Sequence, residues 1–581
     1  MRADGDGGIV VESAQYRLEV PADGGPATLS SPAGRQWARL RLLAALDCAE
    51  GPDETLSVSK PQILGSSTIR IERRSTRWDR ADLTLVCGEE GIEFVASVGG
   101  RGTLTDAHLL GGRSVMPGLP TGFLPSGSSF RTLFSPNPGD PARVLRSAGE
   151  GAVIGAAGDS QPGRGHWFFT PAPLFFALTG AEGVNDPAGR VAAGWVGLAI
   201  AAPVADLTFV ELGYEPADGG FSLRIDYDGH TRADGEFRTP ALVLTPDLPD
   251  PYTGLRRQRE DLVARGAAPP PRRRETPRWW SAPIFSGWGA QCHLARTVGG
   301  RAGDHSTEAS YDGFLDHLER QGVVPGTVIV DDKWQATYGT CEPDREKWPD
   351  LRRWIAGRRR RGQRVLLWWK AWSAEGLPAD LCIRNPDGAP IVLDPTNPAA
   401  REAVRGAVRR MLDADGLDAD GIKIDFTAST PKGRTLTAQG NGWGIALLHD
   451  LLALVYAAAK EAKDDALVMT HTPHPSFADV TDMIRLNDMM RLDDPDPVVP
   501  IVPQMRYRAE VVGSACPDVL IDTDDWCVPD RAAWREYLEV KPALGVPSLY
   551  YATHLDFTGE SLEVDDYEAI RRSWRAWRAK R

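Results

Sequence analysis

The pattern of apolar and polar positions changes near the middle of the 581-residue chain. In residues 1 to about 275, short β-rich runs alternate with turns of glycine, proline and aspartate, as in "ADLTLVCGEEGIEFVASV" and "FSLRIDYDG". Runs of this kind, separated by turn residues, are typical of antiparallel sheets packed as a sandwich. We therefore predict an N-terminal antiparallel β-sandwich over residues 1–270, ending in a linker rich in proline and arginine at 264–280.

After residue 280, strand-like apolar runs alternate with amphipathic helical patterns. The candidate strands are 282–288, 326–332, 364–369, 421–426, 466–471, 482–488, 519–526 and 546–551. Eight strand–helix units in about 280 residues predict a (β/α)8 TIM barrel, which we assign to residues 271–581. Tyr567, Ile570, Trp574 and Trp577 recur at helical spacing, so we expect the C-terminal segment to be the last barrel helix.

Charge and cysteine content narrow the class of protein. The net charge of −13 argues against nucleic acid or an anionic membrane as the main partner. Seven cysteines without a C-x-x-C pair favour reduced thiols and a cytoplasmic location. The sequence has neither the apolar core of a signal peptide nor a run of about 20 apolar residues that could span a membrane. Whether the protein forms a homo-oligomer stays open.

Acidic residues and tryptophans gather where the predicted barrel strands end, which is where barrel enzymes place their active sites. The residues are Asp331, Asp332, Trp368, Trp369, Asp425, Asp488 and Asp525. In "GIKIDF", Lys423 and Asp425 are two apart, so both point to one face of the strand. Lys423 would keep Asp425 ionised at neutral pH, as a nucleophile requires. Spacing alone equally allows a structural ion pair.

Three motifs in this order, "VIVDDKW", "VLDPTNPAAREAV" and "GIKIDF", resemble the clan of retaining α-glycosidases that contains the α-galactosidases. The similarity is closest to glycoside hydrolase family 36, is more distant to families 27 and 31, and covers roughly residues 280–555. The resemblance implies an exo-acting α-glycoside hydrolase of α-galactosidase-like type, which uses double displacement between two aspartates. It implies a carbohydrate substrate and neither a cofactor nor a metal.

The resemblance also implies a role for each matching residue. Asp425 would be the nucleophile and Lys423 a donor to a sugar hydroxyl, while Asp331 and Asp332 would hold the sugar's O4 and O6. Asp488, in "MIRLNDM", is the best match for the acid/base, with Asp482, Asp493 and Asp494 as nearby rivals. The remaining predicted substrate-binding residues are Trp288, Trp368 and Arg485.

Two departures from the family pattern keep other functions open. Lys370, in "WWKAWSAEG", stands where the family often has a glutamate, and "THTPHPSF" replaces a segment usually rich in cysteine, serine and glycine. A transglycosylase, a glycosidase for a different or modified sugar, and a catalytically decayed sugar-binding protein therefore remain alternatives.

The histidines of "THTPHPSF" raise the separate question of a metal site. His471 and His474, with Asp479 and Asp482, could be metal ligands, but their spacing on a proline-broken loop is unlike a helical zinc motif. We expect these histidines to hydrogen-bond to substrate or backbone instead. No glycine-rich phosphate loop precedes a helix, so a nucleotide cofactor is not expected.

Overall fold

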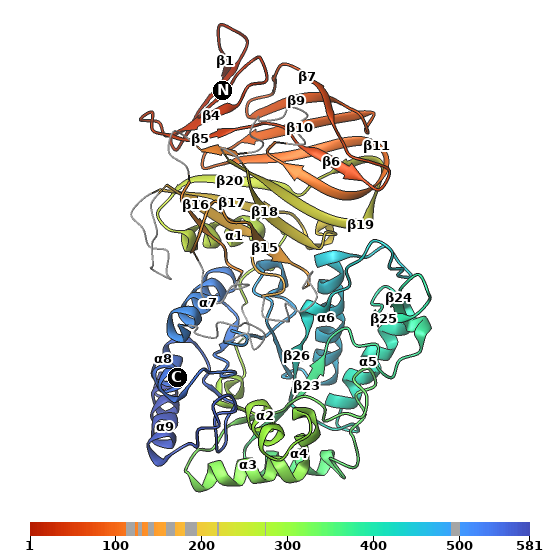
Figure 1. Ribbon diagram of the computed structural model, residues 1–581, viewed down its shortest axis with the longest axis vertical. Coiled ribbons are helices and arrows are strands. Elements are labelled where there is room, and N and C mark those ends of the chain that lie inside the picture. The colour runs from red at the N-terminus through yellow and green to blue at the C-terminus, as the bar shows by residue number, and fades with distance from the viewer. Residues whose placement is uncertain are drawn as a thin grey trace.

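The chain folds into an N-terminal sandwich of antiparallel strands and a C-terminal barrel of parallel strands, seen one above the other in Figure 1. The computed structural model describes residues 1–580 apart from 112–122, 126–129, 138–144, 159–168, 181–193, 218–219, 273–274 and 490–499. This architecture confirms the predicted fold class. The domain division at residue 270 stays a prediction, because side chains from both regions share one buried hydrophobic cluster.

The sandwich is built from strands that pair antiparallel throughout the described residues. They are β1 (Arg2–Ala3), β2 (Ile9–Glu12), β3 (Arg17–Val20), β4 (Ala27–Ser30), β5 (Gln36–Leu40), β6 (Ala45–Cys48), β7 (Thr55–Val58), β8 (Gln62–Leu64), β9 (Thr68–Ser75), β10 (Arg80–Cys87), β11 (Ile92–Leu109), β12 (Phe123–Pro125), β13 (Thr132–Phe134), β14 (Leu145–Ser147), β15 (Ala152–Ala156), β16 (Phe175–Thr179), β17 (Trp195–Ala201), β18 (Glu211–Ala217), β19 (Gly220–Arg238) and β20 (Ala241–Leu248). In β9, Ile69 and Ile71 face the core while Arg70 and Glu72 face outward, as the alternation of a half-buried strand requires.

Helix α1 (Pro251–Ala264) follows the last sandwich strand and was not predicted from the sequence. It begins with a capping hydrogen bond from the Thr253 backbone N–H to Asp250 (2.8 Å), and Pro251 occupies its first turn. Its buried residues Tyr252 and Leu255 pack under β16, β17 and β20, and the helix also contacts α7 of the barrel. Helix α1 therefore packs against both the sandwich and the barrel, and is more than a linker between them.

The barrel contains the eight predicted parallel strands, in the order β29–β28–β27–β26–β23–β22–β21–β30. Its strands are β21 (Ile284–Ser286), β22 (Thr327–Val330), β23 (Arg364–Lys370), β26 (Gly421–Asp425), β27 (Leu467–Thr470), β28 (Met483–Arg485), β29 (Leu520–Asp522) and β30 (Ser548–Leu549). A parallel bridge between Asp522 and Val546 brings the two edge strands together. A short hairpin, β24 (Cys382–Arg384) and β25 (Pro390–Leu393), follows β23.

Helices surround the strands. They are α2 (Trp288–Thr297), α3 (Glu308–Arg320), α4 (Leu351–Arg360), α5 (Pro398–Leu412), α6 (Gly444–Ala462), α7 (Ile501–Ala515), α8 (Arg531–Leu544) and α9 (Val564–Arg578). In α9, Tyr567, Ile570, Trp574 and Trp577 are buried, which confirms that this segment is the last barrel helix. None of the helices in the described ranges combines the length and the hydropathy that crossing a membrane would require.

Alternation along the strands divides the barrel interior into two layers. Toward the amino ends, inward-facing apolar residues such as Ile329, Leu366 and Met483 form a separate cluster, against which Trp280 and Trp577 pack. Two residues further along each strand, the same inward face carries polar or aromatic side chains. These are Ser286 in β21, Asp331 after β22, Trp368 in β23, Lys423 and Asp425 in β26, and Arg485 in β28. The fold thus gathers the charged residues at the carboxyl ends.

The fifth strand–helix unit departs from the predicted pattern. Between β27 and β28, residues 471–482 contain only a short 3-10 helix, η6 (Pro475–Phe477), where the other units have an α-helix. Pro473 and Pro475 explain this, because each lacks a backbone N–H and disfavours the helical conformation of the residue before it.

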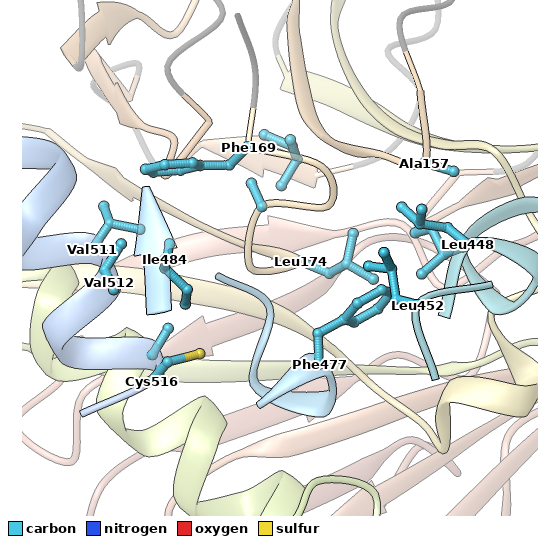
Figure 2. Packing of buried hydrophobic residues seen from close by; sticks show 14 of the residues in the cluster. Ala157, Phe169, Leu174, Leu448, Leu452, Phe477, Ile484, Val511, Val512 and Cys516 are labelled. Atoms are coloured by element: carbon cyan, nitrogen blue, oxygen red, sulfur yellow. The ribbon is translucent and has the colours of Figure 1, made fainter. Parts of the chain in front are cut away.

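Side chains from the sandwich occupy the place beside this short connection. Figure 2 shows Phe169 and Leu174 of the N-terminal part within one buried cluster with Leu452 of α6 and Phe477 of η6. Hydrogen bonds cross the same boundary, including the one from the Tyr507 hydroxyl of α7 to the Ser135 carbonyl (2.8 Å). The sandwich therefore completes the barrel wall on this side.

Candidate active site

The nucleophile candidate, Asp425, is the last residue of β26 and lies among donors and cations. The Trp368 indole N–H donates to Asp425 Oδ2 (3.1 Å), and the Phe426 backbone N–H donates to Oδ1 (2.9 Å). Arg485 Nη1 lies 3.7 Å from Oδ2. Burial alone would raise the pKa of Asp425, but the charges of Arg485 and then Lys423 hold it well below its usual range. This environment therefore favours the ionised form of Asp425, as a nucleophile requires.

The acid/base candidate, Asp488, has the opposite protonation preference. It follows β28, and its Oδ1 accepts a hydrogen bond from Arg485 Nη2 (3.3 Å). Burial raises the pKa of Asp488 well above its ordinary value, and the negative charges of Asp524 and Asp425 add to the rise, against the opposing pull of Arg485. The environment of Asp488 therefore favours its protonated form, which a general acid needs, whereas that of Asp425 favours the ionised form.

Arg485 connects the two carboxylates. Its guanidinium contacts Asp425 and Asp488, and its Nε lies 3.3 Å from Asp524 Oδ2. The arginine is buried, with 2% of its surface exposed, so its charge acts in a poorly screened environment. The structure therefore places Arg485 between the predicted catalytic pair, rather than only beside the substrate.

Asp331 and Lys423 form a second buried pair, with the ammonium 2.7 Å from Asp331 Oδ2. The Ser286 hydroxyl also donates to that oxygen (2.7 Å), and Lys423 donates to the Tyr550 hydroxyl (3.3 Å). Their side chains are 3% and 1% exposed, respectively. Both predicted residues thus reach the site, where they bind one another.

Asp332 is more accessible than its neighbour and faces a different partner. The Tyr338 hydroxyl donates to Asp332 Oδ1 (2.8 Å). Burial raises the pKa of Asp332 to about 6, the Tyr338 hydrogen bond opposes this rise, and the Asp331 charge adds to it. Of the two predicted sugar-binding aspartates, Asp332 is the one with an oxygen left for a substrate hydroxyl.

We expect Asp332→Asn to raise KM for a glycoside substrate by about 10- to 100-fold, because a hydrogen bond to a charged group contributes about 1.5–3 kcal/mol. Its pKa of about 6 gives the sign of the pH effect. Below that pH the carboxyl group is protonated and accepts weakly, so kcat/KM of the unaltered protein should rise as pH increases through 6. The variant should lack this rise in a pH–rate profile. An unchanged acid limb would exclude Asp332 from substrate binding.

Three backbone positions beside the site carboxylates adopt left-handed conformations. Phe426 (φ 60°), Asn487 (φ 68°) and Asp524 (φ 53°) each lie at the carboxyl end of a barrel strand. Non-glycine residues held in this region are uncommon and concentrate at functional sites. At Asn487 the turn has a direct effect, since it ends the strand alternation and lets Asp488 reach Arg485 on the inner face.

The tryptophans predicted to bind substrate have different surroundings. Trp368 is buried and its indole bonds to Asp425, so it positions the nucleophile. Trp288, the first residue of α2, is partly exposed and packs edge-to-face with Trp526, their ring centroids 5.9 Å apart. Trp288 is therefore the one free to offer a ring face to a ligand.

The rival acid/base residues are placed elsewhere or not described. Asp482 precedes β28 and so lies at the amino end of the barrel, where it pairs with Lys460 (2.7 Å) and Arg272 (3.1 Å). Asp493 and Asp494 lie outside the described residues. Asp525, singled out as a strand-end acid, is buried against Lys541 and the Trp534 indole of α8. Asp525 therefore has a structural role, connecting the end of β29 to α8 in the barrel wall.

The two histidines of the fifth loop contact protein groups. His471 Nε2 lies 2.6 Å from Thr427 Oγ1, two residues after the nucleophile. His474 Nδ1 accepts from the Ser476 backbone N–H (3.2 Å), and burial lowers the pKa of His474 to about 3, so that it is neutral. Among the described residues, no three His, Cys, Asp or Glu side chains gather as metal ligands.

Sequence reasoning missed Asp524 and Tyr338. Asp524 could have been found by counting along "LIDTDDW": Leu520 packs near the interior cluster, so Asp522 and Asp524 share its face while Asp525 points outward. Tyr338 lies in an irregular loop after β22, and no sequence pattern marks it.

No protein family model and no curated protein matches the chain. Solved structures do match. A GH31 family sulfoquinovosidase from E. rectale is 11% identical over 98% of this chain and 82% of its own, with a TM-score of 0.59. The alpha-galactosidase from Thermus thermophilus is 14% identical over 87% of this chain and 99% of its own, with a TM-score of 0.52. A cycloalternan-degrading enzyme from Trueperella pyogenes is 12% identical over 96% and 82%, with a TM-score of 0.52.

At such identities the similarity shows the fold alone, a β-sandwich followed by a (β/α)8 barrel. Both GH31 and α-galactosidase structures share it with this chain. The predicted clan-level architecture therefore has support, and the predicted closeness to family 36 is not confirmed.

Proposed function

We propose that the protein is a retaining, exo-acting α-glycoside hydrolase. The observation that carries the proposal is the pair Asp425 and Asp488, which contact one guanidinium while their pKa values move in opposite directions. Two carboxylates with separated pKa values are the equipment of acid/base and nucleophilic catalysis at one centre. The fold shared with α-glycosidase structures supports the same reading.

In the first step, the Asp425 carboxylate attacks the anomeric carbon and forms an ester. The bond to the leaving oxygen breaks, and that oxygen takes the proton of Asp488. In the second step, Asp488 as a carboxylate accepts a proton from water, whose oxygen attacks the anomeric carbon and releases Asp425. Two inversions keep the α configuration. This mechanism requires the carboxyl groups to be about 5–5.5 Å apart when substrate is bound.

The sequence resemblance favours a sugar of the α-galactoside type, held by Asp332 and Trp288, both of which are partly exposed. Asp331 and Lys423 would contribute indirectly, because their buried ion pair fixes the position of both side chains. No residue of this set needs a metal or an organic cofactor for the two steps above.

A panel of 4-nitrophenyl α- and β-glycosides tests the proposal, with proton NMR of the first sugar released. We expect turnover of α-glycosides only, with the α anomer formed first. Adding an alcohol acceptor distinguishes hydrolysis from transfer, since a transglycosylase would yield the alkyl glycoside. Release of the β anomer first would refute double displacement, and no turnover of any glycoside would refute the hydrolase.

A further inference from the structure

Lys370 lies at the level of the nucleophile on the neighbouring strand. It is the last residue of β23 and the register partner of Asp425 in β26. It is two residues beyond Trp368, whose indole bonds to Asp425, so strand alternation directs both side chains to the same inner face. In the sequence, Lys370 stands where the resembled family often has a glutamate, and the two proposed catalytic steps make no use of it.

Two aromatic rings fix the position of the Lys370 ammonium. Its Nζ lies 4.7 Å from the centroid of the Tyr338 ring and 4.6 Å from that of Phe426, the residue after the nucleophile. Cation–π contacts of this length hold a cation without neutralising its charge. Neither contact is a hydrogen bond to an oxygen, so the rings do not satisfy the N–H donors of the ammonium.

The other lysines near the strand ends have carboxylate partners. Lys423 pairs with Asp331 at 2.7 Å, and Lys333 pairs with Glu375 at 3.0 Å. In the described part of the chain, no carboxylate lies within 4.0 Å of the Lys370 ammonium. The charge of Lys370 lowers the pKa of Asp332, but the hydrogen bond that Asp332 accepts comes from the Tyr338 hydroxyl. Lys370 therefore presents a positioned, partly exposed cation beside the nucleophile.

We infer that Lys370 is a specificity residue that binds a negatively charged substituent on the sugar, such as a carboxylate or a sulfonate. Charge-assisted hydrogen bonds are about twice as strong as those between neutral groups, so an anion gains more from this ammonium than a hydroxyl does. The inference rests on the proposed function, because it concerns the same site, and it adds the substrate class.

Binding to a protein that cannot turn over tests the inference separately from catalysis. Calorimetric titration would compare glucuronate and galacturonate with glucose and galactose, and 6-sulfonated glucose would test the sulfonate. The protein is the Asp425→Ala variant, with and without Lys370→Met. We expect the uncharged sugars to bind at least tenfold more weakly than one of the anions. Lys370→Met should remove that preference, whereas Lys370→Arg should keep it.

Lys333→Met is the matched control. The Lys333 ammonium also lies over the Tyr338 ring, at 4.0 Å from its centroid, but it is paired with Glu375. The same chemical change there should leave the preference for anions unaltered. If the anionic and neutral sugars bind equally, or bind with a preference that Lys370→Met preserves, the inference is wrong. If the preference is found but no glycoside is hydrolysed, the inference stands and the proposed hydrolase fails.

Discussion

Replacing Asp425 by alanine should lower kcat for an aryl α-glycoside by about 10⁴-fold or more, because the proposed covalent intermediate forms on this carboxylate. The Trp368 indole and the Phe426 N–H would lose their acceptor, but the Asp425 side chain is partly exposed, so water can take its place. We therefore expect the thermal unfolding midpoint to change little. Steady-state kinetics with a 4-nitrophenyl α-glycoside and a thermal melt measure both quantities.

Azide makes this prediction specific to a nucleophile. In Asp425→Gly, the azide ion fits the space of the lost side chain, attacks the anomeric carbon and displaces the nitrophenolate. The product should be a β-glycosyl azide, the result of a single inversion. Asp415→Ala, at an exposed acid away from the site, serves as the control and should retain full activity. Wild-type activity in Asp425→Ala would remove this residue from the mechanism.

Asp488→Asn should lower kcat by about 10²- to 10⁴-fold for glycosides with a poor leaving group, the usual contribution of a positioned general acid. A 2,4-dinitrophenyl glycoside needs little protonation, so its first step should be far less affected. The leaving-group dependence separates loss of a proton donor from loss of structure, since misfolding would reduce both substrates equally. Equal losses in a variant whose thermal unfolding midpoint is unchanged would assign the proton transfer to another group.

The pH dependence of activity also tests the role of Asp488, and its direction can be predicted. Burial raises the pKa of Asp488, and the protonated form is the one that donates, so activity should fall as pH rises through that pKa. The titration of Asp425 should not appear in the pH–rate profile, because its pKa is lowered and it stays ionised over the pH range of the measurement. The alkaline limb should therefore be present in the unaltered protein and absent in Asp488→Asn.

Much of the fold follows from local pattern. The change from turn-rich alternation to repeated strand–helix units predicted a sandwich followed by a barrel, and the predicted strands match the observed ones closely. The absence of an α-helix between β27 and β28 was also encoded in the sequence, by Pro473 and Pro475. The packing of Phe169 and Leu174 against that gap was not predictable, because contacts between distant segments leave no local signal.

The sequence by itself determined which residues of an extended strand share a face, and so placed Lys423 with Asp425 on the inner side of β26. Tertiary structure decided the partners. Lys423 turned out to bind Asp331, and Arg485 became the main charge beside the nucleophile. The alternation of side chains between the two faces of a strand ends where the backbone leaves the extended conformation. The left-handed turn at Asn487 brings Asp488 to the site, and only the closed barrel sets Asp482 at its opposite end.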